Sequence, residues 1–173
     1  MKKLIVFVCN GNIHRSVVAE KYLSQVLERN HLDNKFSVAS YGLQGTMGIA
    51  KPRHTNLTEY RKEWKAASPT LRKFRIDLTD HFYQKITPAV IKKTAVIIAM
   101  DKKVFSTAKN ALLNQFPKAK NKIHIFSEIT KNHKDIKDPA GNGSFSVHQT
   151  TIKNICSTIE NKLKTILEWT ISK

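Results

Sequence analysis

The chain has 173 residues, 40% of them hydrophobic, and its 30 lysines and arginines against 13 acidic residues give a net charge of +17. This composition excludes a disordered chain, and no apolar run is long enough for a membrane span or for the core of a secretory signal. The length predicts a single domain over 1–173, and two cysteines far apart in sequence predict a reduced, cytoplasmic protein without a disulfide framework or a zinc site.

The first half of the chain alternates between predicted strands and helices. Residues 4–8 form a continuous apolar run typical of a strand buried on both faces, and the apolar spacing over 16–29 predicts an amphipathic helix. A second short strand is expected over 36–41. Residues 54–75 have mostly helical propensity, and proline predicts a break of that helix at Ser68-Pro69.

The second half repeats this alternation. Residues 94–100 predict another fully buried strand, and residues 122–129 a weaker one. Between them a helix is expected to begin at 101–103. Its apolar face would comprise Val104, Ala108, Ala111 and Leu112. A last helix is expected to carry an apolar stripe from Ile152 to Leu167, and Cys156 fits the packed core as part of that stripe.

Strands that alternate with helices predict an α/β fold, a three-layer sandwich with a central parallel sheet of about four strands and helices on both faces. Ligands of such sheets bind at the carboxyl ends of the strands. Cys9 lies at the carboxyl end of the first predicted strand, so we expect the functional site in the loop that follows it.

That loop has the composition of an anion cradle. A loop between a strand and a helix N-terminus points backbone N–H groups into a concavity, and Gly11 and Asn12 tolerate the positive φ that a tight cradle needs. Arg15 adds a planar cation that can hold two phosphate oxygens, and helix and cation together favour the thiolate of Cys9 as a nucleophile. Ser16 can donate a hydrogen bond to that sulfur. The Gly-Lys-Ser/Thr of nucleotide-binding loops is missing, which disfavours ATP or GTP.

Phosphoryl transfer to sulfur also needs a proton for the leaving oxygen, and Asp138 is the candidate general acid. It lies in a loop made rigid by Pro139 and Gly141. The loop follows the strand predicted over 122–129 and can therefore reach the same edge of the sheet. The alternative for this string alone is an ordinary Asp-Pro turn.

The two motifs together resemble the low-molecular-weight protein tyrosine phosphatase family. Residues Val8 to Ser16 look like its signature loop, and Asp138-Pro139 with Gly141 looks like its acid loop. The resemblance also covers Ala19-Glu20, Ser40-Tyr41-Gly42, Ile76-Asp77-Leu78 with His81 and Gln84, and Ile98-Ala99-Met100-Asp101. It therefore runs along nearly the whole chain.

The resemblance implies a role for each matching residue. Cys9 would be the nucleophile that carries a cysteinyl-phosphate, Arg15 would bind phosphate and stabilise the transition state, and Asp138 would protonate the leaving group and then activate water. The phosphate-binding loop would comprise Asn10, Gly11, Asn12, Ile13, His14 and Ser16. Asn12 would hold its shape through Ser16, Ser40 and His81; without the resemblance, His81 would be interpreted as a surface histidine beside a helix. No metal or other cofactor is implied.

The sequence departs from the family pattern at the ends of both motifs. His14 stands where a second cysteine is common, which removes a protective disulfide and makes over-oxidation of Cys9 easier. A protonated His14 would also add positive charge beside the nucleophile. Ala140 and Gly141 replace the aromatic residues that many members carry after Asp-Pro. Ile13 keeps the apolar wall of tyrosine phosphatases, whereas related protein-arginine phosphatases have threonine there.

The segment 52–76 is longer than usual and lies where the family has its substrate-recognition loop. It carries Tyr60, Trp64 and many cations. Three interpretations stay open: the segment replaces the missing aromatic wall, it binds an acidic phosphopeptide, or it is an exposed helix.

The sequence leaves functions of different classes open. The first is a cysteine-dependent phosphatase for phosphotyrosine and other aryl phosphates, with a protein-arginine phosphatase as its alternative. The second is a phosphate-binding module without turnover, against which the acid on a separate loop argues. An arsenate reductase is disfavoured because Cys156 has no second downstream cysteine as a partner.

The net charge is explained by a solvated lysine-rich surface, a phosphorylated substrate, an acidic partner or nucleic acid. No zinc spacing, helix-turn-helix signal or pair of stacking aromatics supports nucleic acid. We therefore expect a phosphorylated protein or a small aryl phosphate as substrate, an acidic protein as a further partner, and neither a membrane nor a specific nucleic acid.

Overall fold

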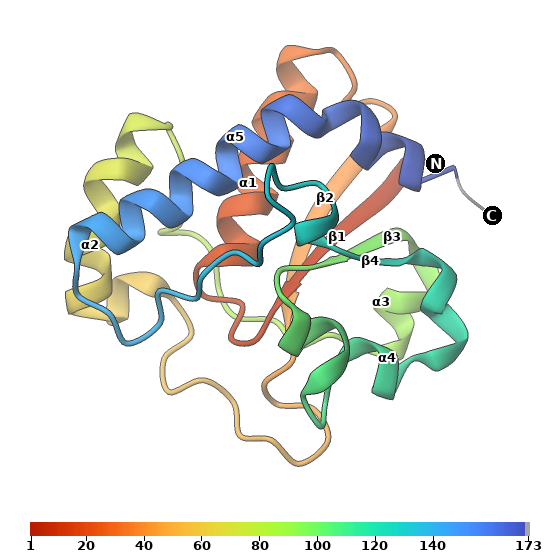
Figure 1. Cartoon of the computed structure of the whole chain (residues 1–173), viewed down its shortest axis with the longest axis horizontal. Coiled ribbons are helices and arrows are strands. Elements are labelled where there is room, and N and C mark those ends of the chain that lie inside the picture. The colour runs from red at the N-terminus through yellow and green to blue at the C-terminus, as the bar shows by residue number, and fades with distance from the viewer. Residues whose placement is uncertain (172–173) are drawn as a thin grey trace.

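The computed structural model describes residues 1–171 and contains a four-stranded parallel sheet with helices on both faces (Figure 1). The strands are β1 (Lys3–Cys9), β2 (Phe36–Gly42), β3 (Thr94–Ala99) and β4 (Ile123–Ile125), in the order β2-β1-β3-β4. The predicted three-layer α/β fold is confirmed. The last two residues of the predicted domain, 172–173, lie outside the described residues.

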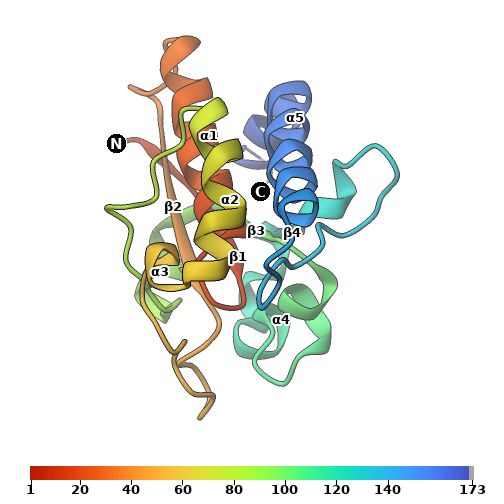
Figure 2. The same cartoon turned by 90° about the vertical axis from the view of Figure 1, so that its left-hand side faces the viewer.

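Two helical layers cover the sheet (Figure 2). One layer contains α1 (Arg15–Arg29), α2 (Arg61–Lys73) and α5 (Phe145–Trp169), and the other contains α3 (Pro88–Lys93) and α4 (Leu112–Gln115). Short helical turns span Leu57–Glu59, Lys103–Thr107, Pro117–Lys122 and Phe126–Glu128. No helix among residues 1–171 has the length and apolarity to cross a membrane.

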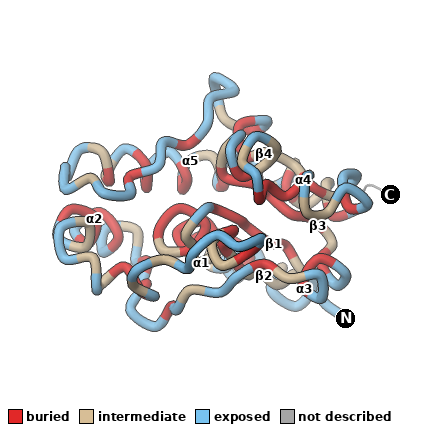
Figure 3. The backbone as a smooth tube through the Cα atoms, turned by 90° about the horizontal axis from the view of Figure 1, so that it is seen from below, coloured by how far each residue is buried: buried red, intermediate tan, exposed pale blue. Residues whose placement is uncertain are grey.

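The alternation of side chains along β1 explains the two layers. Ile5 and Phe7 pack under α1, α2 and α5, whereas Val6 and Val8 pack under α3 and α4. All four side chains are fully buried, and Figure 3 shows the buried backbone between the layers. Because β1 is a central strand with both faces covered, its carboxyl end holds Cys9 in a fixed position.

The predicted break at Ser68-Pro69 is wrong, because α2 continues through Pro69 to Lys73. Pro69 is exposed, and so is Lys65, whose carbonyl loses its hydrogen-bond donor, so this side of the helix is open to water. Ala66, Ala67 and Leu71 are buried on the other side, and this packing outweighs the local preference.

The single helix predicted from 101–103 onward is also wrong. A short turn over Lys103–Thr107 ends at Ala108, whose backbone is extended, and α4 begins only at Leu112. Two side chains impose this path, because Asp101 accepts from the Val104 N–H and Asn110 donates to the Leu43 carbonyl oxygen. The apolar spacing was misleading since Val104 and Leu112 reach the same core cluster across the break.

The ends of two other elements differ from prediction. The strand predicted over 122–129 ends at Ile125, because the Glu128 side chain accepts from the Ile125 N–H and turns the chain into Phe126–Glu128. The last helix begins at Phe145, earlier than the predicted stripe from Ile152, and this extension brings its first turns to the carboxyl end of β1.

Candidate active site

A cleft of about 200 Å³ opens at the carboxyl end of β1. Most of its lining comes from three chain segments: 9–15 after β1, 52–63 at and before the start of α2, and 138–141. Gln44 and His148 complete the lining. Cys9, Arg15 and Asp138, the three predicted catalytic residues, all line this one cleft. The Asp138 carboxylate pairs with Arg15 and also accepts from the Ala140 N–H, as in an ordinary Asp-Pro turn.

The sulfur of Cys9 is held by two donors. The Asn12 N–H lies 3.2 Å from Sγ, and Ser16 Oγ lies 3.1 Å from it. Ser16 Oγ also accepts from Asn12 Nδ2, which leaves the serine hydrogen free to point at the sulfur. Both bonds stabilise negative charge on Cys9.

Asn12 is the centre of a hydrogen-bond network in the loop after β1, the predicted phosphate loop. Its φ of +52° lies in the left-handed region, which asparagine tolerates, whereas Gly11 does not adopt the positive φ expected of it. Asn12 Nδ2 donates to Ser40 Oγ at 2.8 Å, and Asn12 Oδ1 accepts from the Gln84 N–H at 2.8 Å. His81 Nε2 lies 3.1 Å from the Asn12 carbonyl oxygen. The structure thus brings together the four residues that the resemblance grouped.

Two titratable groups around this network are shifted by burial. Burial lowers the pKa of His81, so its ring is neutral and donates to the Asn12 carbonyl through Nε2–H. Burial also raises the pKa of Glu20, a shift that the hydrogen bond from Ser40 opposes. The loop is therefore supported largely by directed hydrogen bonds.

Arg15 is buried and its guanidinium is fixed from two sides. Nη1 donates to Asp101 Oδ2 at 2.5 Å and to the Ile136 carbonyl at 3.0 Å, while Nη2 donates to Asp138 Oδ2 at 2.6 Å. Burial would lower the pKa of Arg15, but the charges of Cys9, Asp138 and Asp101 outweigh it and raise that pKa above its usual value. Arg15 thus remains a cation at every pH of interest.

His14 does not supply the positive charge that its position suggested. Burial is the main reason that its pKa falls from 6.5 to about 3, and the nearby His148 and Arg15 lower it further. His14 Nε2 instead lies 3.2 Å from His148 Nδ1. The His14 ring in the loop that follows Cys9 is therefore neutral near pH 7.

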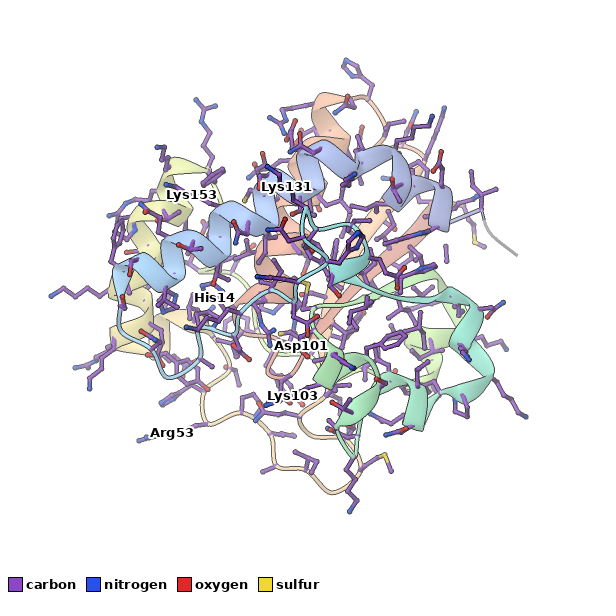
Figure 4. All side chains as sticks on the ribbon, viewed as in Figure 1. His14, Arg53, Asp101, Lys103, Lys131 and Lys153 are labelled. Carbon is purple, nitrogen blue, oxygen red and sulfur yellow. The ribbon has the colours of Figure 1, made fainter. Side chains whose placement is uncertain are left out.

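The segment 52–76 contributes a wall of the cleft, so it is not simply an exposed helix. Leu57 and Tyr60 line the cleft, and Glu63 Oε1 accepts from the Gly141 N–H at 3.2 Å. Arg53 also lines it and points away from the body of the molecule (Figure 4). Trp64, by contrast, packs against the core.

Several residues of the site escaped the sequence analysis as site residues. Asp101 had a signal, because it directly follows a buried strand at the same sheet edge as Cys9. His148 and Glu63 had no such signal in the sequence. Both lie on helices in which the spacing of apolar residues indicates only a packing face. Among residues 1–171, no group of three or more His, Cys, Asp or Glu side chains is arranged to hold a metal ion.

Known proteins share this fold and sequence pattern. The curated relatives include a putative low molecular weight protein-tyrosine-phosphatase of Klebsiella pneumoniae, 27% identical over 80% of this chain and 81% of the relative. A protein-arginine-phosphatase of Bacillus subtilis (strain 168) is 28% identical over 85% of each chain.

Solved structures show the same likeness. The YwlE arginine phosphatase, solved as a mutant with a phosphorylated active-site serine, has a TM-score of 0.74 and 25% identity, with 95% of this chain and 96% of that chain covered. A low molecular weight protein tyrosine phosphatase from T. tengcongensis has a TM-score of 0.74 at 21% identity, with 95% and 99% covered.

The family profile described as low molecular weight phosphotyrosine protein phosphatase matches residues 4–173, nearly the full chain. The match spans the loop after β1, the segment 52–76 and the loop that contains Asp138. This chain therefore belongs to the low molecular weight phosphotyrosine protein phosphatase family.

Proposed function

We propose that the protein hydrolyses phosphotyrosine and related aryl phosphates through a cysteinyl-phosphate on Cys9. The observation that carries this proposal is the convergence of a nucleophile, a cation and an acid from separate segments on one cleft. A module that only binds phosphate needs the cation and the loop amides, but it has no use for Asp138 at the same cleft.

In the first step, the Cys9 thiolate attacks phosphorus, the S–P bond forms and the bond from phosphorus to the phenolic oxygen breaks. Asp138 gives its proton to that oxygen, so tyrosine leaves as a neutral phenol. The hydrogen bonds from Asn12 and Ser16 hold the sulfur in line for attack and stabilise it again as a leaving group.

In the second step, the Asp138 carboxylate takes a proton from water, and the water oxygen attacks phosphorus. The S–P bond breaks, which releases inorganic phosphate and restores the thiolate. Asp138 is well placed for both transfers because its side chain is 44% exposed at the cleft and can reach solvent.

Arg15 stabilises the charge on the phosphoryl oxygens in both steps. Asp101 and the Ile136 carbonyl occupy the two hydrogens of Nη1, and within residues 1–171 Nε donates to no protein atom. The guanidinium edge formed by Nε and Nη2 can therefore bind two phosphate oxygens. For this, the hydrogen bond from Nη2 to Asp138 has to break, so that Nη2 can donate to the substrate.

The lining of the cleft favours an aromatic substrate. Ile13, Pro52, Leu57 and Tyr60 supply apolar and aromatic surface at the mouth, in place of the aromatics missing after Pro139. A phosphoarginine side chain is the second candidate, because the Glu63 carboxylate lines the same cleft and could pair with a guanidinium. The curated arginine phosphatase of Bacillus subtilis, 28% identical, keeps this candidate open.

Wild-type protein is expected to hydrolyse a phosphotyrosine peptide with a larger kcat/KM than a phosphoarginine peptide of the same flanking sequence. The apolar wall is the reason, because burial against it favours an aromatic ring, whereas a guanidinium would lose hydration against that wall. The measurement is phosphate release with a metal chelator present throughout. A preference for phosphoarginine would overturn the choice of substrate, and no release from either peptide would overturn the phosphatase.

Asp138→Ala is expected to slow the reaction in a way that depends on the leaving group. With phenyl phosphate, whose phenolate needs a proton, we expect kcat to fall by about 10²-fold or more. With 4-nitrophenyl phosphate, whose leaving group is stable as an anion, the loss should be much smaller. Asp33→Ala, an exposed aspartate before β2, is the matched control. Equal slowing of both substrates would contradict general-acid catalysis.

A further inference from the structure

A pair of buried histidines joins the phosphate loop to the acid loop. The rings of His14 and His148 meet edge to face, with centroids 5.0 Å apart, and His148 Nδ1 lies 3.2 Å from His14 Nε2. On its other side, His148 Nε2 lies 2.6 Å from the Asn142 carbonyl oxygen. His148 is completely buried in the first turns of α5.

The partners fix the tautomers of both rings when both rings are neutral. A carbonyl oxygen only accepts, so His148 must carry its hydrogen on Nε2 and present a lone pair at Nδ1. His14 must then donate from Nε2 to that lone pair. This assignment leaves His14 Nδ1 as an acceptor, and it is indeed a buried nitrogen without a hydrogen-bond partner. The chain of donors therefore runs from His14 through His148 to Asn142.

The far end of this chain holds the loop that carries the proposed acid. Asn142 is four residues beyond Asp138, and the intervening Gly141 has a positive φ of 73° and donates to Glu63. Asp138 itself is tied to the phosphate loop by its ion pair with Arg15, and the same arginine holds the Ile136 carbonyl two residues earlier. That ion pair has to open when Arg15 takes up phosphate oxygens, whereas the bond from His148 to Asn142 stays.

We propose that His148 is a positioning residue that anchors the acid loop at Asn142, with His14 orienting its ring, so that Asp138 stays at the cleft when Arg15 turns to the phosphate. This inference rests on the proposed function, because it assigns the anchor to the acid of that reaction. It explains how a loop with Ala140 and Gly141 keeps its place without aromatic packing of its own.

Two substitutions of His148 separate its two hydrogen bonds. The amide of glutamine reaches the place of Nε2 and can still donate to Asn142, whereas the amide of asparagine reaches only the place of Nδ1. For His148→Asn we expect kcat on phenyl phosphate to fall about tenfold and kcat on 4-nitrophenyl phosphate to change less than about twofold. His148→Gln should retain most of the wild-type kcat on both. His133→Asn, at an exposed histidine with φ of 50°, is the matched control.

A readout without turnover tests the anchor independently. Nitrogen-15 NMR of the wild-type histidines at pH 8 should show both rings protonated at Nε2, and amide exchange of Gly141 should accelerate in His148→Asn but not in His148→Gln. A His148 protonated at Nδ1, equal slowing of both substrates, or no slowing in His148→Asn would each overturn the proposal. If wild-type protein hydrolyses no phosphate ester, the proposed function fails, and the tautomers and Gly141 exchange still decide whether the anchor exists.

Discussion

Replacement of Cys9 by serine is expected to lower the turnover of aryl phosphates by about 10⁴-fold or more while phosphate binding is retained. A serine hydroxyl keeps its proton near pH 7, so the hydrogen bonds from Asn12 and Ser16 no longer stabilise a nucleophile. The loop amides and Arg15 remain in place and still bind the anion. The measurement is steady-state hydrolysis beside a titration of inorganic phosphate followed by calorimetry.

The second cysteine provides the control for this substitution. Burial raises the pKa of Cys156 to about 12, so it stays a thiol at neutral pH and cannot replace Cys9 as nucleophile. Cys156→Ala should therefore keep the turnover of the folded protein, with a lower unfolding temperature from the lost core packing. Steady turnover by Cys9→Ser, at a rate unaffected by Cys156→Ala, would show that another group attacks phosphorus.

Arg15→Lys should lower kcat/KM by about 10²- to 10³-fold, although the charge is unchanged. A lysine has one ammonium group and cannot bind Asp101, the Ile136 carbonyl and two phosphate oxygens at the same time. Steady-state kinetics on 4-nitrophenyl phosphate measure the loss. Because this leaving group needs little acid help, the result reports on phosphate stabilisation separately from Asp138.

Arg72→Lys is the matched control, since Arg72 is exposed in the last turn of α2 and does not line the cleft. Its kcat/KM should equal that of the wild type. Wild-type kcat/KM in Arg15→Lys, with an unchanged unfolding temperature, would contradict this prediction. It would show that the planar guanidinium is not required, and that a single positive charge together with the loop amides stabilises the phosphate.

Much of this site could be predicted from sequence because its chemistry is local. Cys9, Asn12 and Arg15 lie between a buried strand and a helix, so strand and helix periodicity located them. The role of Asn12 in the network was implied only by the family resemblance. Asp138 is distant in sequence, but its loop follows β4, a parallel neighbour in the same sheet. The parallel order of the strands therefore brought it to the same edge.

The parts that could not be predicted depend on tertiary contacts between segments with no shared pattern. His148 in α5 faces His14, the residue before α1, across 134 positions of sequence, and nothing in either segment marks the pair. The neutrality of His14 is likewise a result of burial, which sequence does not show. Pro69 was misjudged for a related reason, because only the fold reveals that it faces solvent.

The position of α5 at the end of the described chain has a consequence for synthesis. Its buried Ile152, Ile155 and Ile159 complete the core over α1, yet they leave the ribosome after every strand of the sheet. A growing chain is therefore expected to expose the apolar side of α1 until α5 has been synthesised, and exposed apolar surface of this kind promotes aggregation and chaperone binding. We expect a nascent chain that ends before α5 to be aggregation-prone and sensitive to proteases. Its cleft would also be incomplete, because His148 of α5 lines it.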